Sequence, residues 1–225
     1  MRRYATARRP TWCGVLLFLL AFVAFAETPA PSPPLAIPDD DFAPIDVRPR
    51  ADILIDVAHR WSADEVLAGA AAAAFVPATT VPSHLGFTAA DVWLRVHVRY
   101  GRAREHAPPV LVLPKPLTDH VTLYAAAPGV APIETGDERP FASRPLPWRG
   151  FAFPLAAHGS DEVTYYLRVN GTTSALSLPL SLYSAREFRA FAVADGHVLG
   201  AVFGFLGGLL LCALLLTVFA RQGEF

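Results

Sequence analysis

Cysteine is almost absent from this sequence. Its 225 residues include two cysteines, Cys13 and Cys212, and each lies in a long apolar stretch near one end of the chain. The segment between them can therefore form neither a disulfide framework nor a thiolate metal site. It must fold around a hydrophobic core of its own, and about 150 residues are enough for that.

The local motifs of common enzymes are absent as well. The chain contains no G-x-S-x-G, H-E-x-x-H, phosphate-binding loop or G-x-G-x-x-G. Its seven histidines are scattered, with no pair at metal-ligand spacing. The acidic run at 39–41 lacks the glycine turn and the distal glutamate of a calcium loop. We therefore expect no catalytic residues, no metal site and no cofactor. An anchored hydrolase is the alternative that these absences disfavour.

Basic clusters are missing between the two apolar ends. Residues 27–197 carry 14 Lys and Arg against 19 Asp and Glu. A mild acidic excess of this kind favours solubility. It provides no electrostatic footprint for nucleic acid, so no such partner is expected.

The N-terminal stretch has the layout of a secretory signal peptide. Four arginines within the first nine residues precede an apolar core at 11–25, and Ala24-Phe25-Ala26 is a small-x-small cleavage site. We predict a cleaved signal peptide over residues 1–26. The alternative is an uncleaved anchor helix, although the apolar run is shorter than the roughly 20 residues of a membrane span. Cys13 opens the apolar core, which disfavours a lipoprotein.

The C-terminal stretch is long enough to cross a bilayer. Residues 199–220 carry no charge, and Arg221 follows directly. By the positive-inside rule we expect a transmembrane helix over 199–220 and a cytoplasmic stub at 221–225. Gly200, Gly204 and Gly208 share one helix face, on which another helix could pack closely. Glycine scatter in a permissive span is the alternative reading of this stripe.

Two different patterns follow the signal peptide. Residues 27–50 are rich in proline and aspartate, which predicts an extended leader that tethers more than it folds. Ser62 and Glu65 then form a capping box, which predicts a short helix over 63–73.

Alternation of apolar and polar residues dominates the rest of the exported part. In "DVWLRVHVRY", Val92, Leu94, Val96 and Val98 fall on one side. Clean alternation is typical of antiparallel strands with one buried face. Many such strands in one chain predict a two-sheet sandwich or jelly roll. We expect strands in the segments at 53–57, 92–98, 110–113, 121–124, 151–155, 163–170 and 176–183.

The outward faces and one loop supply candidate ligand-binding residues. Sugar recognition uses aromatic platforms and a few orienting polar groups. The strand candidates can equally form a solvated sheet face. Trp148 can equally pack on the sandwich edge, and Arg149 can pair with Asp137 or Glu138. The candidates are Arg95, His97, Tyr124, Arg144, Trp148, Arg149, Tyr166 and Arg168.

Four segments occur in a characteristic order before the last apolar stretch. They read "HLGFTAADVWLRVHVRY", "LPKPLTDHVTLYAAAPG", "TGDERPFASRPLPWRGFAFPL" and "VTYYLRVNGTTSALSLPLSLYS". In them the chain resembles the type 2 extracellular domain of bacterial seven-transmembrane receptors with diverse intracellular signalling modules (7TMR-DISM). The resemblance covers about residues 51–190. The matching positions are Gly86, Trp93, Leu94, Arg95, Asp119, Val121, Tyr124, Gly136, Phe141, Arg144, Pro145, Arg149, Phe153 and Pro154.

The resemblance carries several expectations. It implies a periplasmic, jelly-roll-like β-sandwich sensor domain over 51–190, similar to carbohydrate-binding modules and without catalytic residues to transfer. A juxtamembrane linker at 191–198 would lead into the first of seven spans in the bacterial inner membrane. The remaining spans and a cytoplasmic output module would belong to a longer receptor, of which this chain is the truncated head. Its partners would be the membrane, a small ligand such as a carbohydrate, and a helix at the glycine stripe. The alternative is a stand-alone, membrane-anchored carbohydrate- or envelope-binding module.

Overall fold

A computed structural model describes residues 31–100, 107–157, 160–171 and 173–222. The predicted signal peptide at 1–26 lies outside the described residues, as do residues 223–225 of the predicted stub.

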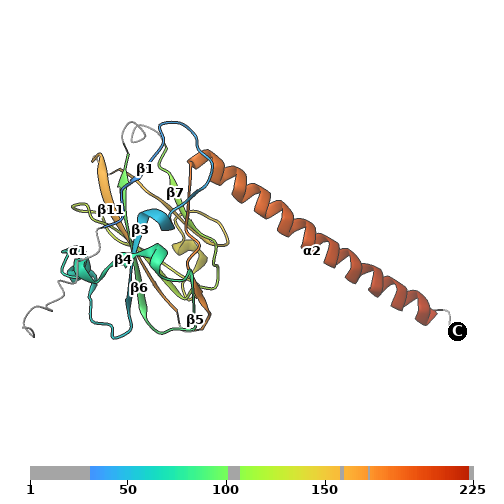
Figure 1. Ribbon diagram of the computed structural model, residues 1–225. Helices are drawn as coiled ribbons and strands as arrows, with labels where there is room; N and C mark the ends of the chain where they lie inside the picture. Colours follow the sequence, from blue (N-terminus) through green and yellow to red (C-terminus); the bar gives the residue numbers. More distant parts are fainter. Residues whose placement is uncertain (1–30, 101–106, 158–159, 172, 223–225) are drawn as a thin grey trace, which may run out of the picture. The chain divides into compact units, whose positions relative to one another are not determined.

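The larger sheet has the strand order β4-β3-β6-β11-β8-β9 with antiparallel neighbours, and β1 joins β6 in parallel. Its central strands β3, β6 and β11 can be followed in Figure 1. The strands are β1 (Leu35–Ala36), β3 (Ala51–Asp56), β4 (Val76–Pro77), β6 (Asp91–Arg99), β8 (His120–Ala125), β9 (Ile133–Thr135) and β11 (Glu162–Asn170).

The smaller sheet has the order β10-β7-β13-β2, again with antiparallel neighbours. A separate two-stranded ladder pairs β12 with β5. The strands are β2 (Ile45–Asp46), β5 (His84–Gly86), β7 (Val110–Leu113), β10 (Phe151–Pro154), β12 (Leu176–Ser177) and β13 (Ser181–Tyr183).

One hydrophobic core joins the two sheets. Leu94 and Leu167 of the larger sheet belong to the same buried cluster as Leu113, Phe151 and Phe153 of the smaller one. In each strand these residues alternate with side chains that point away from the cluster, as the sequence pattern predicted. The prediction of a sandwich of antiparallel sheets is therefore confirmed. Its finer assignment to the jelly-roll topology stays a prediction.

The capping box predicted at Ser62 is present. The Ser62 hydroxyl accepts a hydrogen bond from the Glu65 backbone N–H, and the Glu65 carboxylate accepts one from the Ser62 N–H at 2.9 Å. Helix α1 (Ala63–Leu67) is shorter than the predicted 63–73 because Gly69 takes a left-handed conformation, with φ +84°. The chain then continues through a 3₁₀ turn at Ala72–Ala74.

The prediction that the leader tethers more than it folds is wrong for its described part. Strand β1 pairs with β6, and β2 pairs with β13. Leu35, Ile37 and Val47 are buried in the core between the sheets. Prolines interrupt the segment, but the apolar residues between them pack in the core that both sheets share.

The segment at 176–183 forms two short strands in place of the one predicted. Pro179 lies between β12 and β13, where it has no N–H to donate to a ladder. The chain leaves its pairing with β5 there and joins the smaller sheet.

Helix α2 (Ala185–Gln222) is continuous (Figure 1). It is the one helix among the described residues that is long and apolar enough to cross a membrane. The predicted linker at 191–198 is thus helical and runs directly into the predicted span. Phe188 in the first turn is buried against the outer face of the smaller sheet.

Candidate ligand-binding site

The outer face of the larger sheet carries a continuous row of side chains. Trp93 on β6 lies directly opposite Arg168 on β11, Arg168 lies opposite Thr122 on β8, and Thr122 lies opposite Glu134 on β9. The core-facing residues of the same strands point the other way because side chains alternate along a strand. The register therefore brings these four residues from distant parts of the sequence into one line.

The segment at 61–75 covers part of this face. Val66, Ala71 and Phe75 pack on Leu54 and Trp93, and Trp93 is fully buried. The cover extends over β3 and β6 and reaches β11 at Tyr166. The part of the face over β8, β9 and the end of β11 is left open.

A pocket of about 380 Å³ occupies the open part. This volume lies within the range of about 300–1,000 Å³ that is typical of small-molecule sites. Its lining is mostly polar, with Tyr124 as its aromatic member. The lining residues are His120, Thr122, Tyr124, Glu134, Thr135, Arg139, Arg168 and Asn170.

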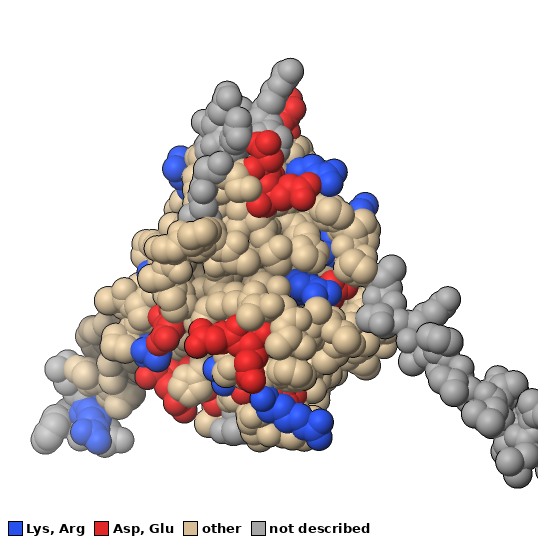
Figure 2. Space-filling view, turned by 90° about the vertical axis from the view of Figure 1, so that its left-hand side faces the viewer, with Lys and Arg blue, Asp and Glu red and all other residues tan. Residues whose placement is uncertain are grey.

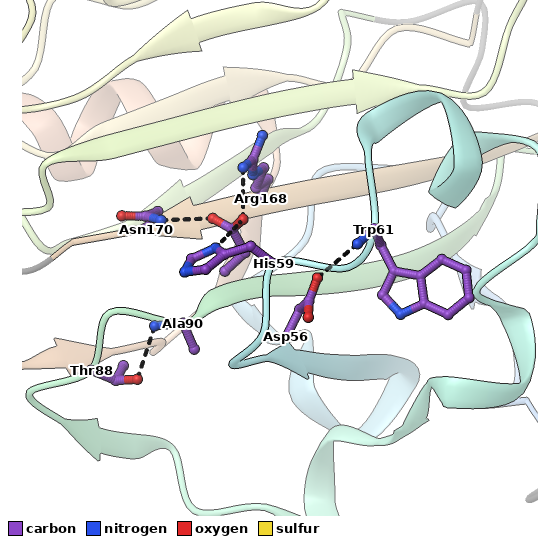
Figure 3. A network of polar contacts seen from close by, with 8 residues as sticks. Asp56, His59, Trp61, Thr88, Ala90, Arg168 and Asn170 are labelled. Atoms are coloured by element: carbon purple, nitrogen blue, oxygen red, sulfur yellow. Dashed lines mark hydrogen bonds and ion pairs between the residues drawn. The ribbon is translucent and has the colours of Figure 1, made fainter.

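The carboxylate of Asp91 organises one side of this pocket. It accepts hydrogen bonds from Arg168 Nη2 at 2.7 Å and from Asn170 Nδ2 at 2.7 Å, and His59 Nδ1 lies 3.0 Å away. Figure 3 labels these three partners and marks their contacts with dashed lines. Its side chain is 2% exposed. Both Arg168 and Asn170 line the pocket, so Asp91 fixes the direction of two groups that a ligand would meet.

The electrostatics around Asp91 favour its charged form. Burial acts to raise the pKa of Asp91, but the hydrogen bonds from Arg168, Asn170 and His59 outweigh it and hold that pKa below its ordinary value. His59 reaches the carboxylate from a backbone conformation with φ 50°, which is uncommon for a residue other than glycine.

The charges in the pocket are balanced in pairs. Arg139 pairs with Glu134 at 2.7 Å, and Arg168 pairs with Asp91. On the face shown in Figure 2, basic and acidic side chains are likewise interspersed, without a broad field of one sign. The pocket thus offers many hydrogen-bonding groups but little net charge.

Two of the eight predicted ligand residues, Tyr124 and Arg168, line this pocket. Arg168 also lies over the Trp93 ring, with its guanidinium carbon 5.3 Å from the centroid. The sheet register holds Tyr124 opposite Tyr166, so the pocket borders the covered part of the face.

Three further predicted residues lie on the same face, beside the pocket. Arg95 pairs with Asp52 at 2.8 Å, and Tyr166 is buried in edge contact with Phe75. His97 shares a hydrogen bond of 2.9 Å with Thr164. Burial, and then the nearby Arg95 charge, lower the pKa of His97.

The remaining three predicted residues lie elsewhere, in the loop before β10, where Trp148 and Arg149 contact helix α2. Trp148 is 6% exposed, and its Nε1 donates a hydrogen bond to Asp195 at 2.9 Å. Arg149 pairs with the same carboxylate through Nε and Nη2, both at 2.7 Å, so the suggested pairing with Asp137 or Glu138 is wrong. Arg144 donates hydrogen bonds to the carbonyl oxygens of Trp148 and Arg149.

Sequence reasoning missed most of the pocket lining. His120, Thr122 and Asn170 occupy outward positions of strands that were predicted correctly, so the alternation contained the signal for them. Glu134 and Arg139 belong to "ETGDER", which the sequence presents only as a turn. Their place beside β8 and β11 depends on the pairing of β9 at the sheet edge.

Comparison with protein families links this region to a known domain. The family model described as 7TMR-DISM extracellular 2 matches residues 48–184, more than half of the chain. The match includes every lining residue of the pocket and ends directly before α2. No curated protein matches the chain significantly.

Proposed function

We propose that this chain, which belongs to the 7TMR-DISM extracellular 2 family, is the ligand-sensing part of a bacterial membrane receptor. The family is an extracellular sensor module and is not catalytic. In this chain the module is followed by one candidate transmembrane helix, α2. The finer proposal has the sensor in the periplasm, α2 in the inner membrane and the C-terminus in the cytoplasm, where an output module would receive the signal.

We propose the pocket on the larger sheet as the ligand site and a neutral, polyhydroxylated molecule such as a carbohydrate as its ligand. The observation that carries this proposal is the pairing of both pocket arginines with carboxylates. An anionic ligand would compete with Glu134 and Asp91 for the two arginines, whereas hydroxyl groups can accept from the arginines and donate to the Glu134 carboxylate at once. Tyr124 supplies an apolar surface for one face of a sugar ring.

The test is a ligand screen on the full chain in detergent micelles. Neutral oligosaccharides, sugar acids and sugar phosphates are added singly, and the thermal midpoint is measured by differential scanning fluorimetry. A neutral sugar at 100 times its dissociation constant is expected to raise the unfolding free energy by about 2.7 kcal/mol, which is visible as a higher midpoint.

The matched variants are Arg139→Gln in the pocket and Arg99→Gln outside it. Both remove an exposed arginine from an ion pair with a glutamate. Arg139→Gln is expected to weaken sugar binding at least about tenfold, the effect of one lost charge-assisted hydrogen bond. Arg99→Gln should leave binding unchanged. A screen in which only anionic ligands shift the midpoint would contradict the proposed ligand class.

A further inference from the structure

The pocket and helix α2 lie on opposite outer faces of the sandwich. The pocket opens on the larger sheet, whereas Phe188, with Phe191 and Ala192 beside it, packs on Val110 and Val112 of the smaller sheet. A ligand in the pocket therefore has no direct contact with the helix. Any influence on α2 must pass through the sandwich or around its edge.

One stretch of chain connects the two places. Glu134, Thr135 and Arg139 line the pocket, and the chain continues from there to Arg149 and into β10. Strand β9 is at the edge of the larger sheet and β10 is at the edge of the smaller one. We name residues 136–150 the crossing segment.

The crossing segment is tied to the pocket at its start. The Asp137 N–H donates to the Thr118 carbonyl at 2.8 Å, and Thr135 and Ser143 share a hydrogen bond of 3.0 Å between their hydroxyls. At Gly136 a Cβ atom would lie 1.9 Å from the Asp119 carbonyl oxygen, so the chain is pressed against the loop before β8. A shift of β9 must therefore move this segment.

The end of the crossing segment is tied to α2. Trp148 and Arg149 both donate to the carboxylate of Asp195, and we name these three residues the helix latch. The Trp148 ring also contacts Phe188 and Phe191, with centroids 6.0 and 5.4 Å away. Asp195 lies four residues, or about 6 Å of helix, before the predicted span.

The latch is rigid on one side and open to water on the other. Arg144 holds the loop by its carbonyl oxygens and lies over the buried Phe151 ring, with its guanidinium carbon 4.8 Å from the centroid. By contrast, the Arg149 side chain is 54% exposed. The Asp195 side chain is 16% exposed, so water reaches the pair from the arginine end. Because the two-bond geometry depends on where Arg149 lies, a small movement of the segment can make or break the latch.

We infer that the crossing segment couples the pocket to α2, and that the helix latch is the switch by which ligand binding repositions the helix. The inference rests on the proposed sensing function for its biological meaning. Coupling between two sites is reciprocal, so breaking the latch must also loosen the pocket wall. This consequence can be tested without any ligand.

The experiment is hydrogen–deuterium exchange of the full chain in lipid nanodiscs, read out by mass spectrometry. Arg149→Gln is expected to speed amide exchange in residues 188–196 about fivefold, as loss of an exposed ion pair allows. It should also speed exchange in residues 134–139, at the pocket. The control Arg99→Gln breaks an exposed arginine–glutamate pair away from the route and should change neither region.

Coupling in the reverse direction, from the pocket to α2, is tested by substituting a pocket residue. Thr135→Val removes the hydroxyl that contacts Ser143 and should speed exchange at 188–196. Thr122→Val, in the same pocket but on β8, should not. If Arg149→Gln affects 188–196 alone and Thr135→Val leaves 188–196 unchanged, the latch is a static anchor and the coupling is refuted. Because no ligand enters this test, its failure would leave the proposed ligand site standing, and a failed sugar screen would leave the coupling standing.

Discussion

At the scale of single residues, Asp91 contributes most to the candidate site. Its partners His59, Arg168 and Asn170 are 32, 77 and 79 positions away in the sequence. Alternation predicted that Arg168 points away from the core, but no local pattern could predict a shared carboxylate among such distant residues. Trp148 illustrates the same limit, because its partner Asp195 is on a helix that follows the last strand.

Replacement of Asp91 tests this organisation. Asp91→Asn keeps the shape but removes the charge that two donors and His59 face, so we expect a loss of about 2–3 kcal/mol in unfolding free energy at pH 7. Asp40→Asn, on the exposed acidic run, is the matched control. The measurement is the thermal midpoint of each full-length variant in detergent.

The pH dependence of that loss follows from the lowered pKa of Asp91. A carboxyl whose pKa is lower in the folded than in the unfolded protein stabilises the fold fully above its ordinary value of 3.8. That contribution disappears as the pH falls through the folded value. The midpoints of wild type and Asp91→Asn should therefore converge below about pH 4. If the difference between the two thermal midpoints stays constant with pH, the carboxylate charge is not what stabilises the network.

At the scale of elements, period-two alternation predicted the principal strands, because a strand with one buried face repeats every two residues. The capping box at Ser62 predicted where α1 begins, since its reciprocal hydrogen bonds are local. Alternation was less informative for the leader. Strands β1 and β2 have two residues each, too few for a period, and their place depends on pairing with β6 and β13.

The leader strand yields an element-scale prediction. Leu35 of β1 is 5% exposed and packs in the core between the sheets. Leu35→Ala should cost about 2–4 kcal/mol and lower the thermal midpoint by roughly 5–10 °C. Asp40→Ala in the same leader should change it little. Equal midpoints for Leu35→Ala and wild type would mean that the leader tethers, as the proline content alone suggests.

At the scale of the whole molecule, the arrangement of the sandwich in layers explains how much of the structure could be predicted from the sequence. The larger and smaller sheets share one core, and each outer face carries a second cluster, under the segment at 61–75 on one side and under α2 on the other. The sequence indicated the sheets because their pattern is local. It did not indicate which outward residues are covered, because the covers come from segments far away in the chain. Arg95 and Trp93 therefore follow the same outward pattern in the sequence as Arg168. In the structure, however, the segment at 61–75 covers them.

The orientation of the whole chain in a membrane is the last prediction. Residues 199–220 carry no charge and Arg221 follows them, so the sandwich should lie outside the inner membrane and the C-terminus inside. The test uses the full chain with Cys13 and Cys212 replaced by serine. One cysteine is then introduced at a new position in each variant. In spheroplasts, a membrane-impermeant maleimide should label Asp40→Cys at once. It should label a cysteine added after Phe225 only when the membrane is disrupted.

A buried position controls for the state of the sandwich. Ala51→Cys, at 0% exposure, should react only after denaturation if the domain is folded outside the membrane. Immediate labelling of the C-terminal cysteine, with Asp40→Cys protected, would put the sandwich in the cytoplasm. The pocket would then face the wrong compartment for an extracellular signal, and the proposed sensing function would fail, although the hydrogen bonds that join the pocket wall to α2 would be unchanged.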